Sequence, residues 1–423
     1  MAVFSRHMDA RITLAGTVLL LALAPGGSFD LQLSAAAAPS FDQTLVAKGA
    51  KLAAIGNCAT CHTSRDGRAF AGGLPLTTPF GTIYSTNITP DPDTGIGRWT
   101  EADFLRAMRE GVDRAGHHLY PAFPYDHFTR VRDEDIAAIY AFIMTREAVR
   151  AEVPANRLKF PAGLRPAIAL WKALYFRAGV YQPDRSKDAQ WNRGAYLVEG
   201  LAHCGACHTP RNALGAEQRQ QELAGGEAEE WHASSLSANS PAPVPWTADQ
   251  IFDYLRRGRE AQHGVAAGPM APVTHSLAGV AEEDVRAIAV YVASQMPTQS
   301  AAAPRRTDAE RAASAEGAQI FAGACASCHD APAATMSIPP VPLELTTALN
   351  APDPRNTIHI VLNGLWPEPG ESGALMPGFA AELTDRQVAA LVDYLRARFT
   401  DQAAWRDVLA RVAAIRRTSE EER

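Results

Sequence analysis

The chain has 423 residues, too many for one compact hydrophobic core, so we expect two to four domains. The composition is that of a soluble globular protein: charged residues make up 20% of the chain, and the net charge is −6. This mildly acidic balance offers no basic field for a nucleic acid, so we expect no nucleic-acid partner.

Residues 1–38 are typical of a secretory signal peptide. Arg6 and Arg11 precede an apolar run over residues 12–24, and small residues follow up to Ala38. Because the run is shorter than the ~20 residues that a membrane-spanning helix needs, we expect cleavage rather than anchoring. The chain is therefore predicted to be exported.

All six cysteines fall in three motifs of the form Cys-x-x-Cys-His. The motifs are Cys58-Ala-Thr-Cys61-His62, Cys204-Gly-Ala-Cys207-His208 and Cys325-Ala-Ser-Cys328-His329. This is the signature of covalent c-type haem attachment. Two thiols one helical turn apart can reach both vinyl groups of one porphyrin, and the adjacent histidine then supplies the proximal iron ligand. A zinc site would need two such pairs brought together, which three separate pairs fit poorly. The sequence therefore predicts three covalently bound haem c groups.

Each third of the chain repeats the same predicted helices around its motif. A helix with a glycine near its start precedes each motif, and such a glycine lets another helix cross at close range; the three are Gly49, Gly194 and Gly317. A middle helix then ends in glycine, running from Trp99 to Gly111, Trp246 to Gly258 and Asp353 to Gly364. An amphipathic helix closes each third, at residues 133–142, 282–291 and 384–395. The pattern predicts an all-α fold of three tandem class I cytochrome c domains, at residues 41–150, 187–298 and 311–400.

A shared register points to the sixth iron ligands. Twelve residues after the glycine that ends each middle helix stand Phe123, Met270 and Met376. A methionine thioether in a Pro/Gly-rich loop is a soft ligand that raises the haem potential. We therefore predict Met270 and Met376 as sixth ligands of the second and third haems, whereas Phe123 cannot bind iron.

The segment Gly-His-His-Leu-Tyr-Pro-Ala-Phe-Pro-Tyr-Asp-His-Phe, residues 116–128, leaves three possibilities for the first haem, because Met108 and Met144, inside the predicted middle and last helices, are interpreted as core residues. His127, four residues after Phe123, is the favoured replacement ligand. His118 is the second possibility, and an open iron is the third. Two histidine ligands would give a lower potential than a histidine and a methionine, which suits a haem that receives electrons first.

Two further segments are candidate docking elements. The linker at residues 151–186 is aromatic and apolar between Phe160 and Phe176, and would either lie on a membrane or partner or pack across two domains. The segment at residues 401–423 is predicted as an amphipathic helix from Ala403, with Trp405 and Val412 on its apolar face. It would either dock on an anionic surface or fold back on the third domain.

Over nearly its whole length after residue 38, the chain resembles the tri-haem cytochrome c subunit of membrane-associated bacterial dehydrogenases that oxidise alcohols, gluconate or aldehydes. Three segments carry the resemblance together with the haem motifs: residues 86–97 (Thr-Asn-Ile-Thr-Pro-Asp-Pro-Asp-Thr-Gly-Ile-Gly), 191–198 and 203–215. The alcohol dehydrogenase branch has a haem-binding methionine in Tyr-Pro-Ala-Met-Pro-Tyr, where this chain has Phe123. That departure, and the tail around Trp405, resemble the branch that serves molybdenum hydroxylases acting on aldehydes or N-heterocycles such as isoquinoline and nicotinate.

The resemblance implies a non-catalytic electron-transfer subunit of an oxidoreductase complex. Such a subunit takes electrons from a dehydrogenase catalytic subunit, here of the molybdopterin type with a small iron–sulfur subunit, and passes them to membrane ubiquinone. It also implies a periplasmic chain attached peripherally to the outer face of the cytoplasmic membrane. The alternative is a haem enzyme such as a c-type peroxidase that uses an open first haem.

Overall fold

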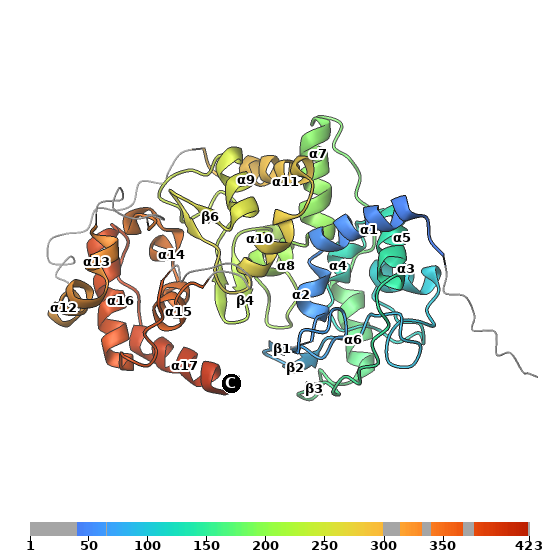
Figure 1. Ribbon diagram of the computed structural model, residues 1–423, viewed down its shortest axis with the longest axis horizontal. Helices are drawn as coiled ribbons and strands as arrows, with labels where there is room; N and C mark the ends of the chain where they lie inside the picture. Colours follow the sequence, from blue (N-terminus) through green and yellow to red (C-terminus); the bar gives the residue numbers. More distant parts are fainter. Residues whose placement is uncertain (1–39, 65, 299–313, 332–339, 367–375, 422–423) are drawn as a thin grey trace, which may run out of the picture. The chain divides into compact units, whose positions relative to one another are not determined.

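The computed structural model describes residues 40–64, 66–298, 314–331, 340–366 and 376–421. The predicted signal peptide lies outside the described residues. Helices dominate the described part of the chain, and three small antiparallel sheets accompany them (Figure 1). None of the described helices has the length and apolar character needed to span a membrane.

The elements recur in similar order along the three thirds. The first third contains α1 (Gln43–Ile55), α2 (Cys58–His62), β1 (Pro75–Thr78), β2 (Gly81–Tyr84), α3 (Glu101–Glu110), α4 (Tyr125–Phe128), α5 (Asp133–Met144) and β3 (Arg157–Leu158), and α6 (Arg165–Tyr175) follows in the linker. The second third contains α7 (Ala189–Tyr196), the π-helix η1 (Leu197–Leu201), α8 (Gly205–His208), the 3₁₀ turn η2 (Arg219–Gln221), β4 (Gly226–Ala228), β5 (Trp231–Ala233), α9 (Ala248–Arg257), β6 (Arg259–Glu260), β7 (Gly264–Val265), α10 (Met270–Ala278) and α11 (Glu282–Gln295). The third contains α12 (Ala315–Ala324), α13 (Ala326–His329), the 3₁₀ turn η4 (Leu343–Leu345), α14 (Thr347–Asn350), α15 (Arg355–Asn363), α16 (Asp385–Phe399) and α17 (Val408–Glu421).

In each third the first helix crosses the closing helix at a glycine, as the sequence predicts. A Cβ added at Gly49 would lie 1.9 Å from the Ala138 carbonyl oxygen, and one at Gly194 would lie 2.0 Å from that of Ala287. At Gly317 the corresponding distance to the Ala390 oxygen is 2.2 Å. The backbones of α1 and α5, α7 and α11, and α12 and α16 therefore touch where only glycine fits.

The middle helices α3 and α9 begin and end as their sequences indicate. Thr100 and Thr247 form capping boxes with the residue three positions on, which satisfies free backbone N–H groups of the first turn. The glycine after each helix has a left-handed backbone, with φ of 59° at Gly111 and 66° at Gly258. The chain thus turns sharply toward the loop that follows, in the same way in both thirds.

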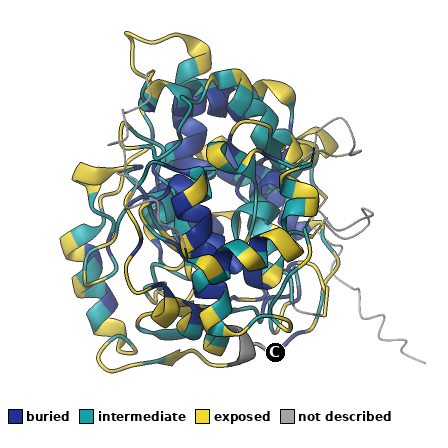
Figure 2. Cartoon of the chain, turned by 90° about the vertical axis from the view of Figure 1, so that its left-hand side faces the viewer, coloured by how far each residue is buried: buried dark blue, intermediate teal, exposed yellow. Residues whose placement is uncertain are grey.

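The buried side chains form two clusters. One runs through the first and second thirds and includes Ile136, Ile139, Tyr196 and Leu201. The other lies in the third third, around Phe321 and α16. Figure 2 shows buried residues along the central helices, with exposed residues on outer turns and loops.

Two predictions need correction or refinement. The all-α description holds only in part, because the strands pair into sheets in the order β1-β2-β3, β4-β5 and β6-β7. The C-terminal helix begins at Val408 rather than Ala403, because Asp407 has a left-handed φ of 55° that breaks helical geometry. Its apolar face folds back on the third core, where Trp405, Val412 and Ile415 are buried.

Candidate functional site

The three haem motifs lie on the short helices α2, α8 and α13, each just after the helix that carries the crossing glycine. All six cysteines are free rather than joined in disulfides, which excludes a disulfide framework. Burial raises the pKa of the Cys58 and Cys204 thiols to about 12, so both are uncharged at neutral pH. The thioether bonds to haem vinyl groups are uncharged too, so the surroundings of these cysteines suit covalent haem attachment.

The histidines that follow the cysteines are oriented as proximal ligands. Nδ1 of His62 lies 2.7 Å from the Thr86 carbonyl oxygen, and Nδ1 of His208 lies 2.7 Å from that of Ser234. A histidine that donates from Nδ1 to a carbonyl presents the lone pair of Nε2 to a metal. Burial lowers the pKa of both rings, which keeps them neutral and able to bind iron. Nδ1 of His329 has no hydrogen-bond partner within the described residues.

An apolar cavity of about 610 Å³ joins the second and third motifs. Its wall contains Cys204, Cys207, His208 and Met270 from the second third and Cys325, Cys328, His329 and Met376 from the third. Each predicted proximal histidine thus shares the cavity with the methionine predicted to bind opposite it. The donors and the apolar lining fit covalent haem with His/Met ligation.

The loops that carry the two methionines are built differently. Met270 begins α10, directly after the β6–β7 hairpin. Met376 pairs with Leu365 through two backbone hydrogen bonds of 2.9 and 3.0 Å, and Gly364 turns the chain there with a φ of 75°. In both thirds the methionine follows a left-handed glycine at the end of the middle helix.

In the first third an aromatic cluster stands at the equivalent position. The Phe123 ring packs against Phe128 with centroids 5.3 Å apart. Tyr125 is fully buried, and its hydroxyl group has no partner within the described residues. The His118 ring is turned to the linker, where its Nδ1 lies 3.1 Å from the Lys172 ammonium group.

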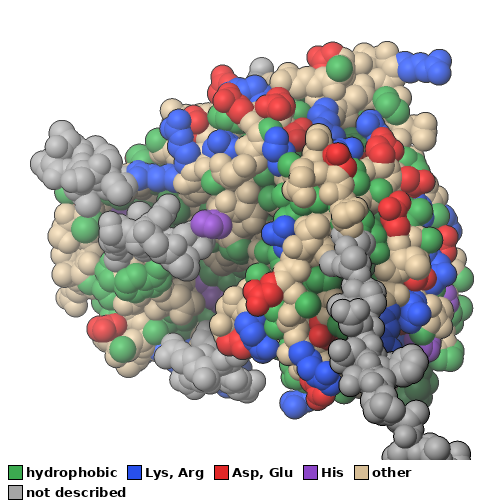
Figure 3. Space-filling model, turned by 45° about the vertical axis from the view of Figure 1, so that its right-hand side comes forward, with side chains coloured by type: hydrophobic (Ala, Val, Ile, Leu, Met, Phe, Trp, Pro, Cys, Tyr) green, Lys and Arg blue, Asp and Glu red, His purple; other side chains and the backbone are tan. Residues whose placement is uncertain are grey.

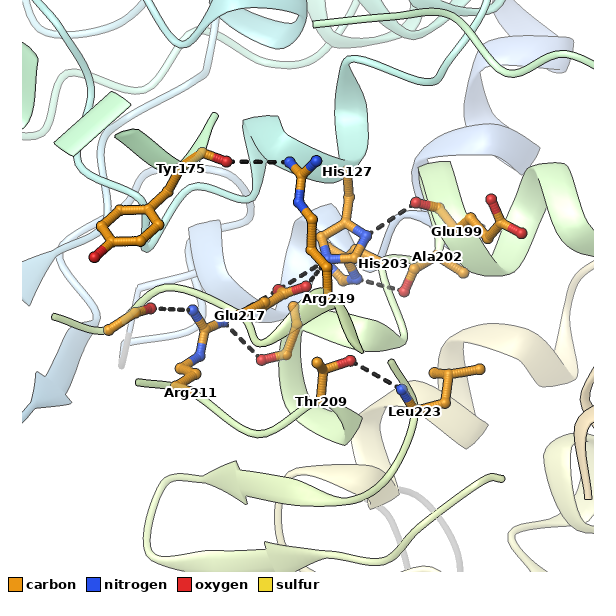
Figure 4. Close-up of polar contacts among 12 residues, drawn as sticks. His127, Tyr175, Glu199, Ala202, His203, Thr209, Arg211, Glu217, Arg219 and Leu223 are labelled. Atoms are coloured by element: carbon orange, nitrogen blue, oxygen red, sulfur yellow. Dashed lines mark hydrogen bonds and ion pairs between the residues drawn. The ribbon is translucent and has the colours of Figure 1, made fainter. Parts of the chain in front are cut away.

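His127 lies at the contact between the first and second thirds, and both of its ring nitrogens are engaged there (Figure 4). Nδ1 is 2.9 Å from the Glu199 carbonyl oxygen, and Nε2 is 2.9 Å from Oε1 of Glu217. The ring also packs on the second haem motif, because a Cβ at Gly205 would meet His127 Cε1 at 2.9 Å. An iron bond would require one nitrogen to leave its partner, so this geometry argues against the predicted ligand role of His127, which stays a prediction.

The His127–Glu217 contact is an ion pair. Burial lowers the pKa of His127, but the hydrogen bond and charge of Glu217 outweigh it and raise that pKa above its ordinary 6.5. Burial raises the pKa of Glu217, but His127 and Arg211 outweigh it and lower the pKa. We call His127, Glu199 and Glu217 the latch. Nothing local in the sequence indicates it, because the two partners are 72 and 90 residues from His127.

A second feature that sequence reasoning missed is the pair His263 and Trp246. Their rings stack with centroids 3.6 Å apart, and both line the shared cavity. His263 is 2% exposed, and neither ring nitrogen has a hydrogen-bond partner within the described residues. Burial lowers the pKa of His263 to about 4, so the ring is neutral.

Helices arranged around Cys-x-x-Cys-His motifs, with the histidines of two motifs lining one apolar cavity, define a c-type cytochrome. The family described as cytochrome c matches residues 46–147, and the family described as cytochrome c oxidase, cbb3-type, subunit III matches residues 312–395.

Three curated relatives show which kind of c-type cytochrome this chain is similar to. The chain is 37% identical to the gluconate 2-dehydrogenase cytochrome c subunit of Pantoea cypripedii, with 94% of this chain and 95% of the relative covered. It is 35% identical to the fructose dehydrogenase cytochrome subunit of Gluconobacter japonicus, with 92% and 85% covered. It is 46% identical to a nicotinate dehydrogenase subunit of Pseudomonas putida, where the match covers 89% of this chain but only 32% of the relative.

The chain therefore belongs to the family of cytochrome c subunits of bacterial dehydrogenases. It is an electron-transfer subunit with covalent haem c. Nothing in these relatives favours the peroxidase alternative.

Proposed function

We propose that the chain carries three haem c groups, one in each third, within three tandem cytochrome c domains at residues 41–150, 187–298 and 311–400. The proximal ligands are His62, His208 and His329, and Met270 and Met376 bind the second and third irons. The observation that carries the proposal for the second and third haems is the shared cavity, which brings their cysteine pairs, histidines and methionines to one apolar space.

The proposed partner is a molybdopterin dehydrogenase with a small iron–sulfur subunit, which oxidises an aldehyde or an N-heterocycle. Phe123, in place of the methionine of the alcohol dehydrogenase branch, supports this choice. The similarity to the nicotinate dehydrogenase subunit supports it as well. In that relative the matching segment is 32% of a longer chain, so a cytochrome part is covalently joined to further protein. In place of that covalent link, we expect this chain to form a close and lasting contact with its own catalytic partner.

The proposed electron acceptor is ubiquinone, and the proposed location is the periplasm, at the outer face of the cytoplasmic membrane. An exported chain with covalent haem fits this location. In the proposal the cysteines bond to haem and form no disulfides with one another. Electrons would enter from the dehydrogenase and leave through closely spaced haems, for which the protein supplies ligands, spacing and exclusion of water.

The number of haems is tested by mass. The purified holo-chain is expected to exceed the mass of its polypeptide by three haem masses, because each cysteine pair forms two thioether bonds that survive denaturation. Replacing Cys58 and Cys61 by serine is expected to remove one haem mass. Intact mass spectrometry under denaturing conditions measures both. A wild-type excess of two haem masses would contradict the proposal.

The acceptor is tested by reoxidation. The dithionite-reduced holo-chain, desalted under anaerobic conditions, is expected to be reoxidised by a short-chain ubiquinone, with loss of the reduced haem absorption bands. The Met376→Ala variant is expected to be reoxidised at a different rate from the wild type, because loss of the thioether lowers the reduction potential of that haem. Met144→Leu, a conservative change in the first core, serves as the control. A reduced wild-type chain that ubiquinone leaves fully reduced would contradict this electron acceptor.

A further inference from the structure

Helix α6 is held firmly between the first and second thirds. The Lys172 ammonium group donates hydrogen bonds to the carbonyl oxygens of Glu110 and Gly111 in the first third. On the other side, Trp171 Nε1 donates to the Leu214 carbonyl oxygen at 2.9 Å. Arg219 donates to that of Tyr175 at 3.1 Å (Figure 4). The linker therefore packs across two thirds, as one of the two sequence interpretations predicts.

The opposite face of α6 is apolar and open. Ile168 and Lys172 are the buried residues of the helix, and Leu170 and Leu174 follow each of them by two positions, about 200° around the axis. Leu170 is 63% exposed and Leu174 is 54% exposed. Phe160 and Leu164, just before the helix, are exposed as well. Of the eight large apolar side chains exposed within the described residues, these four fall in a stretch of 15 residues.

The charge of this segment has one sign. Residues 153–183 contain five basic residues and no Asp or Glu, whereas the whole chain has a net charge of −6. Elsewhere acidic and basic side chains are interspersed, as on the face in Figure 3. Four of the five cations are exposed, namely Arg157, Lys159, Arg165 and Arg177. None of the four forms an ion pair with a carboxylate in the part of the chain that the structure describes.

The C-terminal helix α17, the other candidate docking element, packs its apolar face against the rest of the chain. Its apolar residues Val412 and Ile415 are buried against the third core. Arg416 forms an ion pair with Asp385 at 2.6 Å, and Arg411 lies 3.9 Å from Asp353. The α6 segment thus combines four exposed large apolar side chains with unpaired positive charge, whereas Leu409 is the one exposed large apolar side chain among the described residues of α17.

We propose that the α6 surface, defined as Phe160, Leu164, Leu170 and Leu174 with the rim Arg157, Lys159, Arg165 and Arg177, docks the chain on an anionic lipid bilayer. Exposed leucines and an aromatic ring bury their apolar surface at the acyl boundary, and the cations pair with anionic headgroups. A protein partner would bring some carboxylates to meet four cations, but the combination of exposed apolar side chains with basic and no acidic residues in the same segment matches an anionic lipid surface directly. The inference deepens the proposed function, on which its membrane location rests.

The test is flotation of the detergent-free holo-chain with vesicles of phosphatidylcholine alone or mixed with phosphatidylglycerol. The wild type is expected to float with the mixed vesicles and much less with the neutral ones. Leu170→Gln with Leu174→Gln is expected to weaken binding about tenfold or more, because two exposed apolar contacts are lost. Lys159→Gln with Arg177→Gln is expected to weaken binding to the anionic vesicles by about 25-fold, at about fivefold for each cation.

Leu409→Gln is the matched control, because Leu409 is a 52% exposed leucine on α17. It is expected to float like the wild type. All changed side chains are exposed, so an unaltered circular dichroism and haem spectrum is expected to show that the variants fold. The proposal is overturned if the wild type stays out of all vesicles, if the leucine pair floats like the wild type, or if only Leu409→Gln loses binding. It is also overturned if the leucine pair binds vesicles normally but no longer co-purifies with the dehydrogenase, because α6 would then be a protein contact.

The assay contains neither dehydrogenase nor ubiquinone, so its result is independent of the proposed electron transfer. A chain that reacts with short-chain ubiquinone in solution but ignores vesicles would refute the docking surface alone. A chain that floats as expected but is not oxidised by ubiquinone would refute the electron acceptor alone.

Discussion

At the scale of single residues, the sequence pattern and the structure indicate different roles for His127. Its distance along the chain from Phe123 indicates an iron ligand, whereas both ring nitrogens are bonded to the second third. From the geometry we expect His127→Ala to leave the spin state of the first haem unchanged, as seen by low-temperature EPR of the oxidised protein. Conversion of one haem from low-spin to high-spin would instead establish His127 as its ligand.

The proximal histidines and the thioether cysteines could be predicted from the sequence because haem attachment imposes a fixed spacing over five residues. Met270 and Met376 could be predicted because the repeat provides a register from a glycine. The latch could not, because a hydrogen bond between residues 90 positions apart leaves no trace in either local segment.

At the scale of elements, the crossing of α12 and α16 offers a sharp test within one helix. Gly317→Ala would place a Cβ 2.2 Å from the backbone carbonyl oxygen of Ala390 and 2.6 Å from the Cβ of Tyr394. Because neither helix can yield without repacking, we expect the free energy of unfolding of the third domain to fall by about 3 kcal/mol. Thermal unfolding followed by circular dichroism measures the effect.

Gly323→Ala is the control, because Gly323 lies in the same helix and nothing approaches its Cβ position within 4 Å. Alanine is the better helix former, so this variant is expected to gain about 0.5–1 kcal/mol. Equal losses at both positions would show that the crossing does not require glycine. The helices themselves were predictable from caps, period and terminal glycines, whereas the short strands were not, because two- to four-residue strands carry too little alternation to recognise.

At the scale of the whole molecule, the latch makes the contact between the first two thirds sensitive to pH. The folded pKa of His127 lies above 6.5, so its contribution is complete below 6.5 and is lost as the pH rises through the raised value. The folded pKa of Glu217 lies below 4.5, so its contribution is complete above 4.5 and is lost as the pH falls through the lowered value. The pair therefore stabilises the contact most between about pH 4.5 and 6.5.

His127→Gln is expected to cost about 3 kcal/mol of unfolding free energy within this window, because Glu217 is left buried without its main partner. The cost is expected to shrink at alkaline pH, where wild-type His127 is neutral. Denaturant unfolding across the pH range measures both effects. His117→Gln, at an exposed histidine of the same loop, is expected to leave the pH profile as in the wild type. A deficit in His127→Gln that is constant with pH would refute the ion pair.

The cavity that joins the second and third motifs has a consequence for how the protein is assembled in the cell. Residues of both motifs line this one cavity, so two haems held there as proposed would share it, and a chain that received only one would keep part of the cavity unfilled. Partly loaded chains are then at a disadvantage in folding and in resistance to proteolysis. If both haems bind there as proposed, we expect the two thirds to reach full stability only when both cofactors have been attached.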